Sequence, residues 1–407
     1  MQTVSARVSV LGGLVLGLVA PAGVGQESQR ATRRAESRPE KVEKFGGHLG
    51  GHRGLAKYNK PTADAIVAGL GWLRRHQDPD GRWDADEFMK HDPAADRSRG
   101  PGAATHDIGV TALATLAFLG DGSTPSYGAE RATVARAIRW LITQQGENGL
   151  IGAGAAPDYI YDHAIATCAL CEAFGMTEDE TLRAPAQRAV DYLVSHRNPY
   201  AVWRYQPRDN DNDTSVTAWC LLACRAASDF QLVLDKQVFT MCLAYLDQVT
   251  DPATGRAGYT KRGEGSSRLP GEHAARFPND KNEALTGAAL FCRFFLGQAP
   301  ATTPIMNLAA DTIAAKPPKW NPRDGSIDFY AWYFSTYAIY QMGGRYWQNW
   351  SRTLGPALLP SQRRDGASAG SWDPEVDAWG SVGGRVGTTA FGVLTLEVHY
   401  RFTRLVR

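Results

Sequence analysis

A short turn sequence that returns along the chain constrains the fold most strongly. Its first copy, Gln77-Asp78-Pro79-Asp80-Gly81-Arg82-Trp83, follows the amphipathic stretch Ala65–Leu73. Glycine supplies the positive φ that such turns need, and an Asp before it can bond its own backbone. An altered copy, Gln362–Gly366 followed by Gly370-Ser371-Trp372, stands near the end of the chain. A unit that recurs in this way predicts a repeat protein.

Degraded copies lie between these two. Gln144–Gly149 lacks the tryptophan, and Gly255–Tyr259 is predicted to carry Tyr259 in its place. The simplest interpretation is that glutamine and tryptophan fasten each turn to a neighbouring helix.

Each turn lies between two kinds of helix. His106–Gly120 is apolar nearly all round, which predicts a helix buried on every side, whereas Ala65–Leu73 runs into Arg74, Arg75 and His76 and should face solvent on one side. Further outer helices are predicted at Ala135–Leu141, Arg188–Leu193, Met241–Leu246, Ile305–Ile313 and Tyr346–Leu359. Inner helices are predicted to begin near Asp107, Asp162, Asp213, Asp280, Asp328 and Val386, each with a threonine: Thr111, Thr167, Thr217, Thr286, Thr336 and Thr389. Six hairpins with apolar inner helices need a closed core, and a ring provides one.

The N-terminal segment differs from the repeats. Arg7 precedes the apolar stretch Val8–Ala20 and small residues follow, so residues 1–25 are predicted to be a signal peptide, with an uncleaved anchor as the alternative. Residues 26–60 form a polar tail that we expect to be largely disordered. The mature protein is therefore expected to be exported, periplasmic or extracellular, without a stable membrane span.

Charge and cysteine content exclude several classes. The formal net charge is only +2, and no basic stripe marks the repeats, so no nucleic-acid partner is expected. The six cysteines all fall within predicted helices, as small apolar core residues would. The alternative for Cys168 and Cys171 is a Cys-x-x-Cys zinc or redox site, but no further ligands are evident nearby.

The repeat resembles that of the squalene cyclase and protein prenyltransferase β-subunit superfamily. The likeness covers residues 61–407 and is greatest to bacterial proteins with prenyltransferase/squalene oxidase repeats; Asp328–Thr336, continued by Gln341–Gly344, strengthens it. The resemblance implies an all-α fold, an (α/α)6 toroid of six helical hairpins with a central cavity.

The catalytic patterns of that superfamily are incomplete here. Cyclases of the squalene–hopene type use Asp-x-Asp-Asp-Thr, and the nearest match, Asn210–Thr214, keeps Asp213, places Asp211 at the variable position and has Asn at the other two acids. Prenyltransferases hold zinc with Asp-x-Cys, but Asp328 is followed by Phe329 and Tyr330. No metal and no cofactor is therefore expected, and the sequence leaves open whether the chain is an enzyme.

Acidic residues at the inner-helix starts define a candidate site, because those starts should converge on one face of the ring. Asp is also a preferred helix cap, so capping alone is the competing interpretation. The predicted catalytic residues are Asp211 and Asp213. The predicted cavity rim consists of His106, Asp107, Asp162, His163, Trp219, Asp280, Glu283, Asp328, Tyr330 and Trp332. Trp219, Tyr330 and Trp332 belong to a larger aromatic set with Tyr333, Phe334, Tyr337 and Tyr340 that can line a cavity or simply fill the core.

Three functions remain open at this stage. The first is an exported toroid that binds an unidentified ligand or partner in its cavity without catalysis. The second is a terpenoid cyclase-like enzyme with a rearranged acid set, which an apolar cavity would favour. The third is a carbohydrate-active (α/α)6 lyase or hydrolase, which a polar groove with two facing carboxylates would favour.

Overall fold

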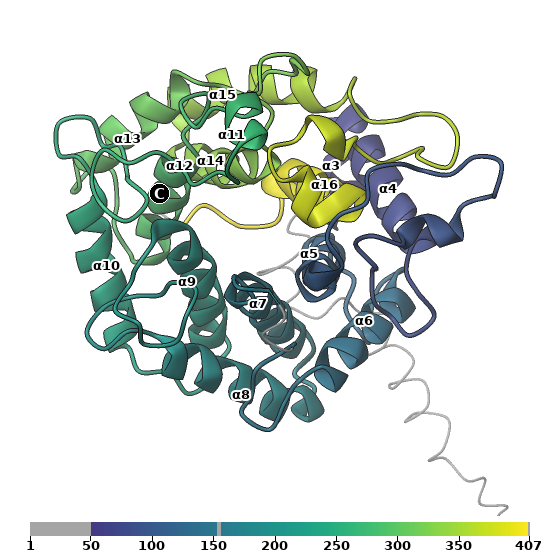
Figure 1. Cartoon of the computed structure of the whole chain (residues 1–407), viewed down its shortest axis with the longest axis horizontal. Helices are drawn as coiled ribbons and strands as arrows, with labels where there is room; N and C mark the ends of the chain where they lie inside the picture. Colours follow the sequence, from purple (N-terminus) through teal and green to yellow (C-terminus); the bar gives the residue numbers. More distant parts are fainter. Residues whose placement is uncertain (1–49, 153–155, 406–407) are drawn as a thin grey trace, which may run out of the picture. The chain divides into compact units, whose positions relative to one another are not determined.

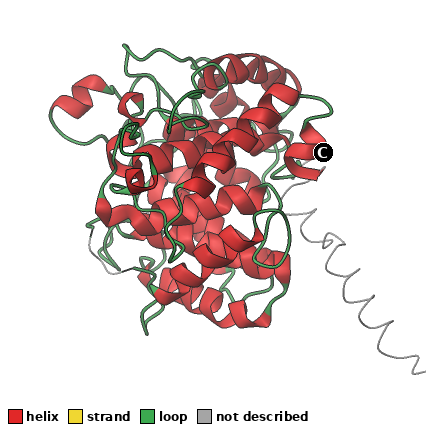
Figure 2. Ribbon diagram, turned by 90° about the vertical axis from the view of Figure 1, so that its right-hand side faces the viewer, coloured by secondary structure: helices red, strands yellow, loops and turns green. Residues whose placement is uncertain are grey.

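The computed structural model describes residues 50–152 and 156–405, all within one compact unit, Pro39–Arg407. Within these residues the chain is all-helical, and its only β pairing is two isolated bridges (Figure 2). The predicted signal peptide and most of the predicted polar tail lie outside the described residues. The end of that tail forms α3 (Gly51–Leu55), in which Leu55 is buried.

Six inner helices form a closed ring (Figure 1). They are α5 (Asp107–Gly120), α7 (Ile160–Thr177), α9 (Thr214–Asp229), α12 (Ala284–Phe295), α14 (Phe329–Met342) and α16 (Gly380–Leu396). Each packs on the next, and α16 packs on both α14 and α5, so the ring closes. In α5 every residue from Gly109 to Gly120 is buried, as an all-round apolar helix requires.

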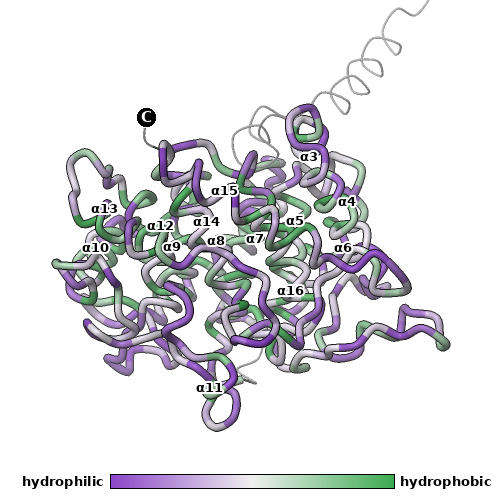
Figure 3. The backbone as a smooth tube through the Cα atoms, turned by 90° about the horizontal axis from the view of Figure 1, so that it is seen from above, coloured by the Kyte–Doolittle hydropathy of each residue, from purple (hydrophilic) through white to green (hydrophobic). Residues whose placement is uncertain are grey.

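Six outer helices surround this ring. They are α4 (Lys60–Arg75), α6 (Arg131–Thr143), α8 (Glu180–His196), α10 (Gln237–Val249), α13 (Ile305–Ala314) and α15 (Gly344–Leu358). Each packs against an inner helix with its apolar side. In Figure 3 the green, hydrophobic stretches run mainly through the middle of the ring, whereas purple dominates the loops at its edges. The predicted (α/α)6 toroid of six hairpins is therefore confirmed.

Two inner helices begin elsewhere than predicted. Helix α16 starts at Gly380, six residues before Val386, and is kinked at Gly384, where φ is 59° and ψ is −166°. Helix α12 starts at Ala284, four residues after Asp280. Among the described residues, none of the helices has the length and hydropathy needed to cross a bilayer.

The glutamine of the repeat joins neighbouring hairpins. The side-chain amide N–H groups of Gln77 donate to the carbonyl of Gly81 in its own turn (2.9 Å) and to that of Thr133 on the next outer helix (3.0 Å). Gln145 repeats the arrangement with Gly149 and Pro185. One planar amide thus satisfies two backbone acceptors from different repeats.

The tryptophan fastens each turn to its own hairpin. The indole N–H groups of Trp83, Trp203 and Trp372 donate to Leu73, Leu193 and Leu358, at the ends of the preceding outer helices. The backbone N–H at this position donates to an inner-helix threonine, as Trp83 does to Thr111 at 2.8 Å. Thr217 and Thr389 accept the same bond from Trp203 and Trp372, so it accounts for these recurring threonines of the sequence.

The degraded copies keep this backbone bond with other residues. In the fourth hairpin Ala257, rather than Tyr259, takes the tryptophan position and donates to Thr286 at 3.2 Å, which corrects the sequence prediction. In the second hairpin Ile151 takes that position, and its N–H donates to Nδ1 of His163 at 3.1 Å. His163 thus accepts the bond that a threonine accepts elsewhere.

All six cysteines are buried and free. Burial raises the pKa of each thiol, so none is activated as a nucleophile.

The last glutamine of the repeat, Gln362, joins the last hairpin to the first, so its substitution tests whether these amide bonds stabilise the ring. Gln362 donates to Gly370 and, across the chain, to Ala65 on the first outer helix, both at 2.8 Å. Gln362→Ala leaves both buried carbonyls without this donor and should lower the free energy of unfolding by about 1–3 kcal/mol. The control Gln144→Ala removes only an exposed side-chain contact with Thr143 and should change it by less than about 0.5 kcal/mol. Equal urea midpoints for the two variants would contradict the scheme.

Candidate functional site

A cavity of about 320 Å³ lies among the starts of the inner helices. Its lining comes from α5, α7, α9, α14 and α16 and from the loop Ser266–Pro270. Helix α12 contributes no lining residue, and this loop lines the cavity instead. Its floor is apolar and aromatic: Val110, Leu113, Ile165, Trp219, Tyr330 and Phe391. Its rim is polar: His106, Asp158, Asp162, Ser215, Arg268, Asp377 and Thr388. The cavity can therefore take a molecule with an apolar body and a polar end.

Glycines on α16 keep the cavity open. Gly383 and Gly387 both line it, and a Cβ added to either would meet only Val110, at 3.7 and 3.5 Å. A larger side chain at these positions would extend into the cavity instead of clashing with the backbone.

His106 and Asp162 form a pair on one side of the rim. His106 Nδ1 lies 3.1 Å from Asp162 Oδ2, and its Nε2 lies 4.0 Å from Asp158 Oδ1. Burial alone would lower the pKa of His106, but the hydrogen bond to Asp162 and the neighbouring carboxylates outweigh it and raise that pKa. Burial raises the pKa of Asp162, against the opposing effect of His106. The pair can take up or release a proton at the cavity wall.

Asp377 lies on another side of the rim and was not predicted from the sequence. Its Oδ1 accepts the N–H of Phe329 at 3.0 Å, and its Oδ2 accepts the hydroxyl of Thr388 at 3.1 Å. Burial, and then the negative charge of Asp328, raise its pKa to about 7. A large share of Asp377 is therefore protonated at neutral pH.

Asp328 is paired behind the cavity wall. Its Oδ2 accepts from Arg268 at 2.9 Å and from Asn282 at 3.0 Å, and its Oδ1 caps α14 by accepting the N–H of Ala331. Arg268 itself lines the cavity, and its guanidinium lies 5.6 Å from the ring centre of Trp379. This ion pair fastens the loop before α11 (Glu272–Arg276) to the ring. Figure 3 shows α11 and α3 at opposite edges of the ring.

Two of the three predicted aromatic residues line the cavity. Trp219 stacks on Tyr333 with a ring separation of 5.8 Å, and the Tyr330 hydroxyl bonds Ser215 at 2.7 Å. Trp332 is buried elsewhere, against Trp320 and Phe329, and does not belong to the lining.

Neither of the predicted catalytic residues belongs to the cavity lining. Asp213 is fully buried and caps α9 by accepting the N–H of Val216 at 2.7 Å. Its Oδ2 has no hydrogen-bond partner in the described part of the chain, with Arg204 Nε 3.7 Å away. Burial, opposed by the Val216 N–H and Arg204, raises its pKa to about 7. Asp211 is 67% exposed and lies 3.4 Å from Arg204 in a separate outer pocket.

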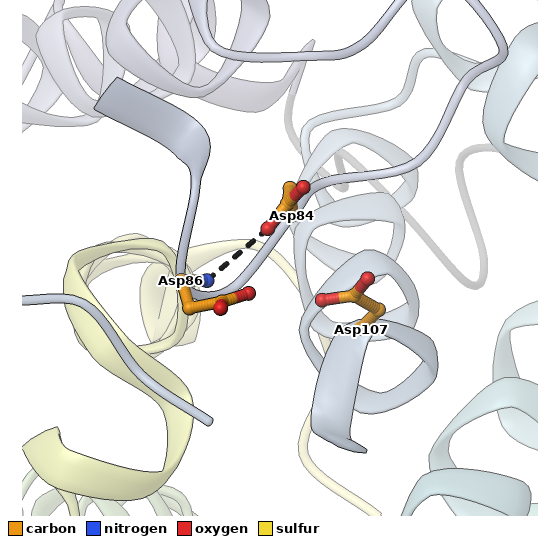
Figure 4. Close-up of side chains that lie close together, drawn as sticks. All are labelled: Asp84, Asp86 and Asp107. Carbon is orange, nitrogen blue, oxygen red and sulfur yellow. Dashed lines mark hydrogen bonds between the residues drawn. The ribbon is translucent and has the colours of Figure 1, made fainter. Parts of the chain in front are cut away.

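Asp107 belongs to a cluster with Asp84 and Asp86 (Figure 4). Ligand atoms of the three carboxylates lie within 4.8 Å of one another. Asp84 Oδ1 accepts the Asp86 N–H, while Asp107 accepts the Ala85 N–H and burial raises its pKa to about 6. Arg82 contacts Asp84 and Asp107, and Lys90 contacts Asp84, so two cations offset part of the negative charge. The cluster therefore has its own cations.

The three other predicted rim residues lie away from the cavity. His163 accepts from Ile151 and donates from Nε2 to Ala189, and burial lowers its pKa to about 3, so it is neutral. Glu283 is held by Arg256 and Lys316 at 2.7 and 2.8 Å. Asp280 is exposed.

Several lining residues were missed in the sequence, among them Asp158, Tyr161, Tyr205, Arg268, Asp377 and Trp379. A signal for Asp377 existed. It stands three residues before the glycine-rich start of α16, much as Asp280 stands four residues before α12.

Comparison with known proteins supports the fold alone. No family model and no curated protein matches the chain. Among solved structures, the chain is similar to type II terpene cyclase MstE from Scytonema, with 17% identity and a TM-score of 0.53 over 83% of this chain and 97% of that one. It is also similar to cellobiose 2-epimerase from Bacillus thermoamylovorans, with 13% identity and a TM-score of 0.54 over 83% of this chain and 98% of that one. A third similar structure is an α-amylase from Clostridium perfringens, with 12% identity and a TM-score of 0.54 over 82% of this chain and 98% of that one.

The raised pKa values of Asp213 and Asp377 predict how stability depends on pH. Each is about 7 in the folded protein and about 4 in an unfolded chain, so between these values the folded state binds more protons. The contribution of these two carboxyls to stability should therefore be greatest below about pH 4, fall as the pH rises to 7, and level off above it, by up to roughly 4 kcal/mol per group.

Asn substitutions isolate each group. Asp213→Asn keeps the size and the capping oxygen, and its stability relative to the wild type should rise between pH 5 and 8, as should that of Asp377→Asn. Urea midpoints at the two pH values check this. Parallel pH curves for a variant and the wild type would show that the substituted carboxyl does not titrate as stated. If Asp213 also acts in binding or chemistry, its Asn variant will lose ligand affinity or activity at nearly constant stability.

Proposed function

We propose that the central cavity binds a small hydrocarbon-rich molecule with an oxygen group at one end and isomerises it by proton transfer. The observation that carries the proposal is Asp377, a carboxyl with a pKa of about 7 in the wall of a largely aromatic cavity. The sequence pattern of residues 1–25 supports a further part of the proposal, that the protein is exported.

The lining supports an apolar ligand body. Leu113, Ile165, Trp219 and Phe391 form a floor without charged groups, so a hydrocarbon chain or ring gains by leaving water there. Aromatic faces such as that of Trp219 also stabilise positive charge that develops on a ligand. A type II terpene cyclase of similar fold has been solved with geranylgeranyl dihydroxybenzoate, a substrate of this general kind.

Asp377 is suited to an oxygen group at the rim. A protonated carboxyl in an apolar site donates a hydrogen bond to a carbonyl oxygen and stabilises negative charge that develops on it. A pKa near the working pH also allows complete transfer of that proton, after which Phe329 N–H and Thr388 stabilise the carboxylate.

The His106–Asp162 pair completes the reaction. In its deprotonated state the pair takes a proton from the γ carbon of an α,β-unsaturated carbonyl compound while Asp377 protonates the oxygen. The reverse transfers then return a proton to the α carbon and take the oxygen proton back to Asp377. Protons gained and lost are equal, so this isomerisation needs no co-reactant. The acid set is thus rearranged relative to that of the cyclases, and Asp377 takes the role that the sequence assigned to Asp211 and Asp213.

A carbohydrate-active enzyme is the second candidate. The observation that favours it is the polar rim, where His106, Asp158 and Asp162 gather beside the cavity mouth. In that case a sugar, not a hydrocarbon, would bind the central cavity.

Filling the cavity tests where the ligand binds. Gly387→Leu extends a side chain into the space from a helical position without a backbone clash, and should lower the affinity for farnesal by about tenfold or more. The control Gly71→Leu makes the same change on α4, where a Cβ would meet only Arg75 at 3.6 Å, and should bind normally. Native mass spectrometry with farnesal and cellobiose gives both affinities. Binding of cellobiose alone, lost in Gly387→Leu, would replace the proposal by the second candidate.

Asp377→Asn separates binding from chemistry. Asn keeps the shape and can still accept the Phe329 N–H, but it has no acidic proton. We expect the wild type to incorporate deuterium from D₂O into bound farnesal, and Asp377→Asn to bind farnesal while exchange slows by about a hundredfold. NMR follows the exchange. Binding without exchange in the wild type would reduce the function to a ligand-binding toroid.

A further inference from the structure

A second pocket of about 310 Å³ lies on the outer side of the same hairpins. It is bounded by the turn around residues 200–212, by α10 and by Thr260, and shares no lining residue with the central cavity. The proposed function makes no use of it.

Neutral polar groups dominate this outer pocket. Asn210 and Gln248 contribute side-chain amides that can donate and accept hydrogen bonds. The Asn212 amide is bonded within the turn, and the Thr260 hydroxyl donates to Glu264. The two charged residues of the lining, Arg204 and Asp211, lie 3.4 Å apart and compensate each other. A ligand rich in hydroxyl groups and without net charge is complementary to this set.

Tyr200 supplies an aromatic surface at the pocket edge. Its residue is 82% exposed, so the fold gains little from burying the ring. Its backbone has φ 57°, a left-handed conformation that disfavours side chains other than Gly, Asn and Asp. Folding therefore gives no reason for a tyrosine here. Asn210, with φ 67°, tolerates the same conformation more easily.

We infer that this outer pocket is a binding site for a neutral saccharide. The Tyr200 ring stacks on the apolar face of one sugar unit, while the amides of Asn210 and Gln248 bond its hydroxyl groups. Asn212 positions the turn, since its Oδ1 accepts the N–H of Val202 at 3.0 Å.

Tyr200→Gly distinguishes a binding role from a structural one. Glycine adopts a positive φ without strain, so the variant should be at least as stable as the wild type and yet bind saccharide about tenfold or more weakly. The control Tyr58→Ala removes a tyrosine that is 83% exposed elsewhere and should bind normally. Gln248→Ala should also weaken binding, without a change in Tm.

The probes are cellotetraose, maltotetraose, xylotetraose and mannotetraose at millimolar concentration, followed by saturation-transfer NMR, with Tm recorded for each variant. Binding of one of them that is lost in Tyr200→Gly and retained in Tyr58→Ala and Gly387→Leu supports the site. Absence of binding by all four overturns it. Binding that Gly387→Leu abolishes and Tyr200→Gly leaves intact also overturns it, since the sugar then occupies the central cavity. Farnesal binding in the central cavity tests the proposed function separately.

Discussion

The whole arrangement depends on a side-chain amide that bonds two backbone carbonyls from successive repeats. Gln77 and Gln145 make these bonds between neighbouring hairpins, and Gln362 makes them between the last hairpin and the first. An unpaired buried carbonyl is costly, so each bond fixes how one outer helix approaches the next. These bonds stand at three of the six junctions, including the one between the last hairpin and the first, and so favour a closed ring over an open solenoid.

Closure brings the starts of the inner helices together and creates the site. Backbone N–H groups at helix starts favour carboxylates, while burial in the ring opposes their ionisation. The balance differs among the acids. Asp328 is paired with Arg268, whereas burial holds Asp377 and Asp213 near a pKa of 7. Only Asp377 of these last two lines the cavity, which is why the proposed chemistry rests on it.

Much of the fold was accessible from the sequence. Hydrophobic periodicity located the inner and outer helices, and the Gln-x-x-Asp-Gly turn with its tryptophan predicted the bonds between them. The boundaries failed where local signals were weak. The glycine-rich start of α16 lacks an apolar pattern, so the helix was placed six residues late and Asp377 was overlooked.

The sequence by itself determined the hairpins, the ring and the presence of acids at the inner-helix starts, because periodicity, turn chemistry and capping act over a few neighbouring residues. Only the tertiary structure decided which acids face the cavity. Asp162 and Asp377 do, Asp213 turns into the wall, and Asp280 stays exposed because α12 begins four residues later. Those differences depend on how helices from distant parts of the chain pack, and so on contacts that no local pattern encodes.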